Sequence, residues 1–272
     1  METEKRSLHQ GSTELGARRD LTEWARQRLG VVPDDWQADV LTTPKRRVIL
    51  NCSRQSGKAE AAVLRVLHTI VACPGSVSLL YLPTPKQSHE LLCRVLELYR
   101  HLENDTPARR KTRDTLELVN GSRVIALSGK ASTMCTYSAD LIVVAKAARV
   151  PDPVFDELTP MLAVTGGALI LLSTPCGASG YFAKAWKDGD PEVWHKVRIT
   201  APMLPGITLS HPEPEGVCPR IPLDFLEAER AMMPEAVFLS TYYGEFLPDT
   251  FSVFSYAAIE QAMLSDVEPW DL

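Results

Sequence analysis

One eight-residue segment restricts the fold of this chain more than any other part of the sequence. It reads Cys52-Ser53-Arg54-Gln55-Ser56-Gly57-Lys58-Ala59, and it lies between the apolar run Val48–Leu50 and a segment with helical spacing, 57–72. A strand, a glycine-containing loop and a helix in this order form a phosphate-binding loop, in which backbone N–H groups at the helix start face an anion. The segment therefore predicts an α/β fold with a nucleotide or phosphate site.

The residue types of this segment fit that chemistry, except the last one. Gly57 permits close approach of the backbone, Lys58 places an ammonium on the β- and γ-phosphates, and Arg54 supplies a second cation. The expected nucleotide-binding residues of the loop are Ser53, Arg54, Gln55, Ser56, Gly57 and Lys58. The pattern G-x-x-x-x-G-K-[ST] ends in a hydroxyl that binds Mg²⁺, and Ala59 lacks it. An ordinary turn between a strand and a helix is the alternative interpretation.

Short apolar runs alternate with helical segments along the chain, which predicts a mainly parallel sheet with helices on both faces. Expected strands are 48–52, 76–82, 141–144, 168–172 and 194–199, with a hairpin of 116–119 and 122–127 around Asn120-Gly121. Expected helices are 21–30, 57–72, 86–102, 153–163, 180–186, 223–233 and 235–246. Prolines crowd the stretch from about 202 onward, before the last two helices. We therefore expect an N-terminal tail with a short helix (1–30), a P-loop ATPase-like core (31–205) and a linker with a small helical subdomain (206–272).

Composition argues against several classes of protein. No apolar run approaches the roughly 18 residues of a membrane span, and the polar N-terminus leads into no signal-peptide core. The six cysteines include no C-x-x-C pair, which predicts neither a zinc site nor a disulfide framework but reduced thiols in the cytoplasm. The net charge of −5 does not indicate a nucleic-acid partner. The basic cluster Arg109–Arg113 is either a solvated loop or a contact with a DNA backbone.

The pair Trp36-Gln37, upstream of the loop, is a second candidate for nucleotide binding. A glutamine amide can both donate to and accept from an adenine edge, and a neighbouring aromatic side chain can support the ring. The alternative is a surface glutamine beside a core tryptophan. The loop downstream favours the nucleotide interpretation.

Four motifs in order resemble the ATPase domain of the large terminase subunit of tailed phages, the DNA-packaging motor. They are Gln37, the loop Ser53–Lys58, the run Leu141–Val144 with the residues after it, and Leu172-Ser173-Thr174-Pro175; the resemblance runs from about Trp36 to Leu247. It implies that Trp36-Gln37 recognises adenine and that Ser173, Thr174 and Pro175 couple nucleotide state to DNA movement.

The resemblance also implies ligands and partners. ATP is the expected nucleotide, and double-stranded DNA, the portal protein and the small terminase subunit are the expected partners. A homo-oligomer is possible, no membrane partner is expected, and the place of action is the cytoplasm of a bacterial host, in a phage or prophage context. Large terminases carry a second, RNase H-like nuclease domain; this chain ends at Leu272, about where it would begin, so we expect no DNA cleavage.

The chain departs from the family at its second acidic motif, which is four apolar residues followed by Asp-Glu. Here Leu141–Val144 are followed by Ala145-Lys146. In the family the Asp would hold Mg²⁺ and the Glu would activate the attacking water. Together with Ala59, three positions around one metal ion and one water have lost their groups, which puts Mg²⁺ binding in doubt and leaves no intact catalytic residue.

The departures therefore predict a pseudo-ATPase that binds nucleotide or DNA without efficient hydrolysis; a weakly active, ATP-dependent DNA-translocating motor is the alternative. Other carboxylates do not obviously replace the missing pair: Asp140 precedes the strand, and Asp152, Asp156 and Glu157 are expected on a helix surface. Lys146 could replace part of the charge of Mg²⁺ beside a phosphate, or it could turn to solvent. No metal site is expected.

Overall fold

The computed structural model describes residues 21–129, 137–210 and 214–246, and its centre is a nine-stranded sheet. The strand order is β3-β4-β5-β2-β6-β7-β1-β8-β9. The strands are β1 Arg47–Cys52, β2 Val77–Tyr81, β3 Ala108–Lys111, β4 Thr115–Leu118, β5 Arg123–Leu127, β6 Leu141–Ala145, β7 Ala168–Ser173, β8 Trp194–Thr200 and β9 Gly216–Val217. Neighbours are parallel except in the pairs β3–β4 and β4–β5, which are antiparallel. The mainly parallel α/β fold is confirmed.

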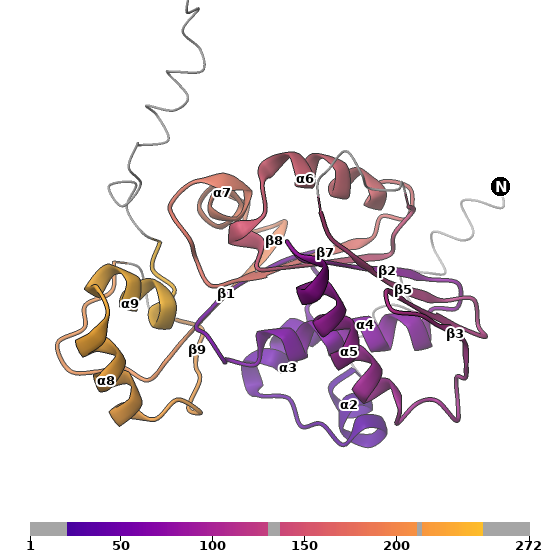
Figure 1. Cartoon of the computed structure of the whole chain (residues 1–272), viewed down its shortest axis with the longest axis horizontal. Coiled ribbons are helices and arrows are strands. Elements are labelled where there is room, and N and C mark those ends of the chain that lie inside the picture. The colour runs from indigo at the N-terminus through magenta and orange to yellow at the C-terminus, as the bar shows by residue number, and fades with distance from the viewer. Residues whose placement is uncertain (1–20, 130–136, 211–213, 247–272) are drawn as a thin grey trace, which may run out of the picture.

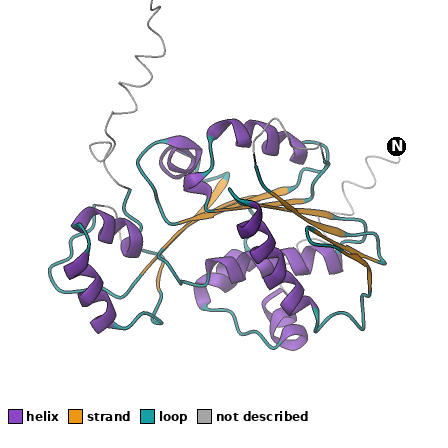
Figure 2. Ribbon diagram, in the orientation of Figure 1, coloured by secondary structure: helices purple, strands orange, loops and turns teal. Residues whose placement is uncertain are grey.

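Helices cover both faces of this sheet (Figures 1 and 2). One face carries α2 Leu21–Leu29, α3 Asp35–Thr42, α4 Lys58–Ala72 and α5 Pro85–Tyr99, and the other carries α6 Asp152–Leu158 and α7 Gly180–Asp188. Two 3₁₀ turns, η2 Ala147–Arg149 and η3 Thr159–Leu162, flank α6. The helices α8 Leu223–Met232 and α9 Glu235–Tyr243 lie together beyond the β8–β9 edge, in yellow and orange in Figure 1.

The two-sided cover explains why the strands are apolar at nearly every position. Along β1, Val48 and Leu50 pack into the cluster on the α4 side, whereas Ile49 packs into the cluster on the α6 side. The side chains of β6 alternate in the same way, so that Ala145 faces the α4 side. Strands buried on both faces cannot alternate apolar with polar residues, which is why the sequence shows continuous runs.

Local chemistry sets the ends of the main helices. Thr84 caps α5 by accepting a hydrogen bond from Gln87 N, and Pro85 occupies the first turn, where its missing N–H costs nothing. The predicted helix 153–163 is divided: α6 ends at Leu158, and the 3₁₀ turn η3 follows. Pro160 lies in the first turn of η3 and cannot donate the hydrogen bond that would continue α6.

Three elements were not expected from the sequence. Residues Trp36 and Gln37 lie inside α3, which starts with a capping box between Asp34 and Gln37. The basic residues Arg109, Arg110 and Lys111 form the edge strand β3, with exposed side chains, and not a loop. Strand β9 lies within the proline-rich stretch and pairs with β8, so the sheet continues beyond residue 205.

The helices α8 and α9 share a small apolar cluster of their own. Its buried members are Ala201, Leu204, Ile221, Leu226, Phe238, Tyr242 and Tyr243. The grouping of these residues is compatible with a helical subdomain, and the exact domain boundaries stay a prediction. Within the described residues, no helix has both the length and the apolar character needed to cross a bilayer.

Candidate nucleotide site

The carboxyl ends of three neighbouring parallel strands bring the predicted motifs to one edge of the sheet. In the strand register Asn51 of β1 lies opposite Ser173 of β7, and Leu172 lies opposite Ala145 of β6. The loop 53–57, the segment 173–175 and the pair Ala145-Lys146 therefore start side by side. Ligands of open α/β sheets bind outside the carboxyl ends of the strands, which is where these segments meet.

The loop 53–57 has the backbone of an anion nest. Gln55 and Gly57 both have positive φ, 57° and 90°, and alternation of right- and left-handed residues turns successive N–H groups toward one point. Ser53 and Ser56 are buried, whereas Arg54 and Gln55 are exposed. The fold thus presents the Arg54 side chain at the surface of the loop and encloses the two serines.

Lys58 begins α4 and points back into the loop. Its Nζ donates a hydrogen bond to Ser53 O at 2.8 Å. Burial lowers the Lys58 pKa below its ordinary value of 10.5, the negative form of the Cys52 thiol would raise it, and the Arg54 charge lowers it further. An anion in the nest would stabilise the charged ammonium, so the site favours a negatively charged ligand.

The structure places Gln37 against the loop. Its Nε2 donates to Gly57 O at 3.0 Å, and its Oε1 accepts from Asp34 N at 2.9 Å. Trp36 is buried, and its Nε1 donates to Asp34 Oδ2 at 3.2 Å. Both predicted residues are therefore near the site, with polar groups engaged within the protein. Adenine recognition by this pair stays a prediction.

Two residues that the sequence did not single out also hold the loop. Arg220 Nη1 donates to Ser56 O at 3.0 Å, and Arg220 Nη2 forms an ion pair with Asp34. The Cys218 thiol donates to Gln55 O at 3.8 Å. These residues lie more than 160 positions from the loop along the chain, and no local pattern marks them; the fold alone brings them there.

The segment 173–175 connects the loop with α9. Thr174 Oγ1 donates to Cys52 O at 3.1 Å, and Ser240 Oγ of α9 donates to Pro175 O at 3.2 Å. From the other side, Arg54 N donates to Thr241 O at 3.2 Å. A hydrogen-bonded path thus joins the loop, the end of β7 and α9, although the predicted coupling role of Ser173, Thr174 and Pro175 stays a prediction.

The residues at this edge do not form a Mg²⁺ site. Ala145 is buried on the α4 side, Lys146 is exposed, and Ala59 packs against the core. No group of three His, Cys, Asp or Glu side chains within the described part of the chain could hold a metal ion. Mg²⁺ prefers carboxylate, hydroxyl and water oxygens, and positions 59, 145 and 146 offer none of these side-chain oxygens.

The neighbouring carboxylates have other partners or positions. Asp140 Oδ2 accepts from Val77 N at 2.8 Å, at the amino end of β6 and therefore at the opposite edge of the sheet. Asp152 Oδ1 accepts from Tyr181 N at 2.8 Å. Asp156 and Glu157 are exposed on α6, as expected from the sequence. None of these four residues takes the place of the absent Asp-Glu pair.

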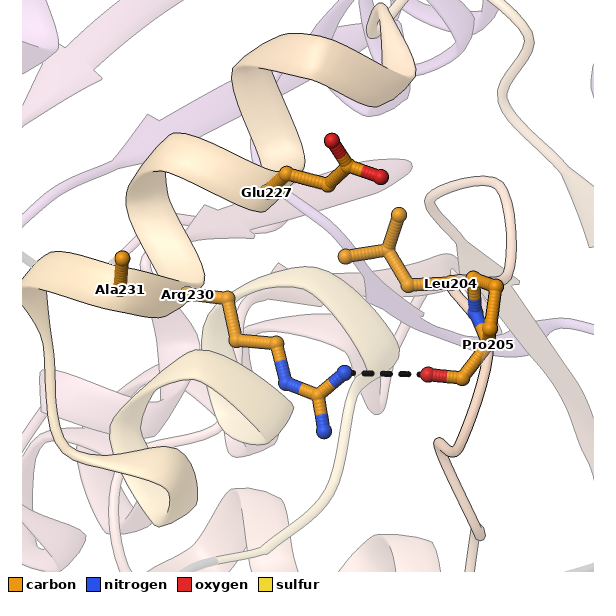
Figure 3. A pocket seen from close by; sticks show the side chains of 5 residues that line it. All are labelled: Leu204, Pro205, Glu227, Arg230 and Ala231. Carbon is orange, nitrogen blue, oxygen red and sulfur yellow. Dashed lines mark hydrogen bonds between the residues drawn. The ribbon is translucent and has the colours of Figure 1, made fainter.

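A separate hollow lies in the region of α8, shown in Figure 3. It has a volume of about 340 Å³ and is lined by Leu204, Pro205, Glu227, Arg230 and Ala231. Arg230 Nη1 donates to Pro205 O at 3.1 Å across it. None of the lining residues belongs to the loop edge, and the hollow lacks the convergent N–H groups of the nest, so we place the nucleotide site at loop 53–57.

No protein-family model matches the chain. Two curated proteins named "Terminase, large subunit" are similar to it, one from Thermus virus P23-45 and one from Thermus phage G20c. Each is 27% identical over 259 residues, which covers 84% of this chain and 51% of the relative. The chain therefore spans about half the length of the curated relatives that it matches.

Solved structures show the same fold. The large terminase ATPase domain of Thermus phage P74-26 has a TM-score of 0.65 at 22% identity, covering 81% of this chain and 96% of that domain. The HK97 bacteriophage large terminase has a TM-score of 0.64 at 17% identity, covering 85% and 55%. The large terminase of a thermophilic bacteriophage, solved in complex with ADP, has a TM-score of 0.57 at 12% identity, covering 85% and 53%. The chain is thus a relative of the terminase large subunits of phages and has the fold of their ATPase domain.

Proposed function

We propose that this chain binds ATP at loop 53–57 and has lost efficient ATP hydrolysis. The observation that carries the proposal is the composition of one sheet edge, where the loop and Lys58 lie beside Ala145 and Lys146 in place of two carboxylates. The terminase solved with ADP supports a nucleotide as the ligand class. Binding needs the nest and the ammonium, whereas hydrolysis also needs a held metal ion and an activated water.

The remaining residues can bind and orient a triphosphate. Backbone N–H groups of the loop face the anion, Lys58 supplies a charge-assisted hydrogen bond, and the exposed Arg54 can reach a terminal phosphate. Mg²⁺, when bound in a phosphoryl-transfer enzyme, neutralises charge developing on the phosphates. The donors present here do not fit it, and no side chain at the end of β6 is a base for water.

The decisive experiment compares the wild-type chain with a triple variant, Ala59→Ser, Ala145→Asp and Lys146→Glu. We expect the wild type to bind ATP by calorimetry with no turnover above that of a Lys58→Met control. We expect the triple variant to gain Mg²⁺-dependent phosphate release. Robust hydrolysis by the wild type that disappears in Lys58→Met would refute the proposal.

Lys146 leaves two interpretations of metal-free binding. Its side chain is exposed and follows β6 directly, at the edge where the loop lies. An ammonium about 4 Å from a phosphate contributes on the order of 4 kcal/mol of Coulomb energy at an effective dielectric constant near 20. If Lys146 replaces Mg²⁺, ATP affinity without Mg²⁺ should fall in Lys146→Ala. A strong Mg²⁺ requirement in the wild type would exclude this replacement and favour a solvent-facing Lys146.

The alternative function is a weakly active, DNA-translocating terminase motor. The contacts that join the loop, Pro175 and α9 favour it, because a motor must transmit nucleotide state. Its partners would be double-stranded DNA, the portal protein and the small terminase subunit, in a homo-oligomer in the cytoplasm of a bacterial host. The exposed basic strand β3 is the candidate DNA contact. DNA-stimulated ATP hydrolysis, reduced in Arg109→Ala/Arg110→Ala, would favour this function over the first.

A further inference from the structure

Three successive carbonyl groups of loop 53–57 are each bound from outside the loop. Gln55 O accepts from the Cys218 thiol at 3.8 Å, Ser56 O accepts from Arg220 Nη1 at 3.0 Å, and Gly57 O accepts from Gln37 Nε2 at 3.0 Å. We call Gln37, Cys218 and Arg220 the outer belt. Its members come from both sides of the loop, Gln37 from α3 and the other two from the segment between β9 and α8.

The outer belt determines the direction of the loop's N–H groups. A trans peptide unit is planar, so the N–H of each residue points away from the carbonyl of the residue before it. Carbonyls of Gln55, Ser56 and Gly57 that are held outward therefore turn the N–H groups of Ser56, Gly57 and Lys58 inward. Those inward N–H groups are the donors of the anion nest.

The backbone of the loop needs such support. Gln55 has φ 57°, a left-handed conformation that residues with a Cβ avoid. Strained residues of this kind persist where surrounding contacts determine them. Packing around Gly57 is tight as well: a Cβ at that position would lie 2.8 Å from Gln37 Nε2 and 3.3 Å from Arg220 Nη1. The belt leaves no room for any residue other than glycine at position 57.

Asp34 connects the two sides of the outer belt. Its carboxylate forms the ion pair with Arg220, and its backbone N–H donates to Gln37 Oε1. A closed circuit thus runs from Asp34 through Arg220 to Ser56 O, and from Asp34 through Gln37 to Gly57 O. Arg220 occupies a central place, because its guanidinium spans the ion pair and the loop with two different nitrogens.

We propose that Arg220 is a positioning residue for phosphate binding, which it supports by holding the N–H groups of loop 53–57 toward the ligand. The proposal rests on the proposed function, in that the ligand is the triphosphate of ATP. Arg220 lies just before α8, so phosphate binding and the position of the helical subdomain are linked through it. Linkage is reciprocal: a bound phosphate strengthens the Arg220 contact as much as the contact strengthens phosphate binding.

The proposal predicts which ligands respond. A belt that positions phosphate donors should affect ATP and inorganic pyrophosphate by the same factor. A residue that reads the base should affect ATP and leave pyrophosphate unchanged. We expect Arg220→Ala to weaken both by about tenfold, which is the effect of one hydrogen bond to a charged group. Gln37→Ala should also weaken pyrophosphate binding if Gln37 acts through the belt.

The experiment uses the full chain and two independent measurements. Calorimetry gives the affinities for ATP and pyrophosphate, and hydrogen exchange of the ligand-free protein gives the protection of amides 55–58. The variants are Arg220→Ala and Arg220→Lys, which keeps the charge and a donor. Arg109→Ala is the control, because Arg109 is exposed on the strand at the far end of the sheet order. The thermal midpoint of each variant checks that the fold is retained.

The expected result is faster loop exchange and weaker binding in Arg220→Ala, partial recovery in Arg220→Lys, and no change in Arg109→Ala. Unchanged loop exchange in Arg220→Ala, or an effect on ATP without an effect on pyrophosphate, would overturn the proposal. If the wild type binds neither ligand while Arg220→Ala still accelerates loop exchange, the belt stands and the proposed function fails.

Discussion

Lys58 is an ammonium enclosed by a loop that offers it a carbonyl oxygen. Among the described residues no carboxylate lies within 4.0 Å of its Nζ, and its hydrogen bond goes to Ser53 O. Burial lowers its pKa, followed in size by the opposing effect of the Cys52 thiol and the lowering effect of Arg54. A charge kept in this way without a counter-ion costs stability, and an anionic ligand would remove that cost.

Replacing this lysine should change both binding and the pH dependence of stability. In Lys58→Met we expect ATP affinity to fall at least about tenfold, because a charge-assisted hydrogen bond is lost. Since folding lowers the Lys58 pKa, the unfolded state binds more protons, and the free energy of unfolding gains a rising contribution as pH increases toward 10.5. Urea unfolding from about pH 7 to 10.5 should show this contribution in the wild type and in the control Lys86→Met, an exposed position. A wild-type-minus-Lys58→Met difference that stays constant with pH would contradict it.

Lys146 has a left-handed backbone, with φ 55°, immediately after β6. This conformation costs a residue with a Cβ roughly 1–2 kcal/mol, whereas glycine adopts it freely but loses more freedom on folding. We expect Lys146→Gly to raise the free energy of unfolding by up to about 1 kcal/mol. Arg149→Gly is the matched control, in the 3₁₀ turn η2, and should lower it. Urea denaturation that shows equal losses in both variants would exclude strain at Lys146.

At the scale of elements, the sequence predicts best where burial acts on a continuous run. The strands β1, β6 and β7 follow from apolar residues buried on both faces, and the β4–β5 hairpin follows from Asn120-Gly121. It misses α3 because Pro33 suggests a break, although the Asp34–Gln37 capping box starts a helix two residues later. It misses β3 because charged residues on an edge strand look like a loop, and edge strands favour such residues.

The docking of α9 against the sheet depends on a glycine. Gly244, at the end of α9, has φ 70°, and its carbonyl accepts from the buried Asn51 Nδ2 at 2.8 Å. A Cβ there would lie 3.0 Å from Asn51 Oδ1, whereas a Cβ at Gly206, with φ 74°, would meet nothing within 4 Å. We expect Gly244→Ala to cost about 1–2 kcal/mol more than Gly206→Ala in urea denaturation, since overpacking adds to the shared left-handed strain. Equal losses would show that the Asn51 contact yields without cost.

At the scale of the whole molecule, the candidate site is assembled from distant segments, and this limits what a sequence can show. The loop is predicted because its residues are consecutive, and Ala145-Lys146 because they follow a recognisable strand. Arg220 and Cys218 are not predicted, because their contacts arise when β9 joins the sheet edge beside β8. Long-range contacts of this kind leave no spacing pattern. The same reason hides the contact between Thr241 and Arg54.

A buried ion pair fastens the end of the helical region to the sheet. Arg198 of β8 and Glu245, just after α9, are 4% and 7% exposed, and Arg198 Nη2 lies 2.5 Å from Glu245 Oε1. Arg198 also donates to Tyr243 O through Nε at 3.0 Å and Nη2 at 2.8 Å. Two charges removed from water contribute little net stability as a pair, but removing one partner leaves the other buried without its counter-charge.

This asymmetry gives a prediction for how the molecule holds together. We expect Glu245→Gln to lower the free energy of unfolding by about 3 kcal/mol, and Arg198→Met/Glu245→Leu to recover most of that loss. Because the pair joins β8 to the segment after α9, hydrogen exchange in Glu245→Gln should accelerate in α9 before it accelerates in β1. Asp105→Asn, which removes the partner of Arg28 in an exposed pair, should cost less than about 1 kcal/mol. A double variant as unstable as Glu245→Gln would mean that the charges themselves, and not the unpaired Arg198, determine how α9 is held.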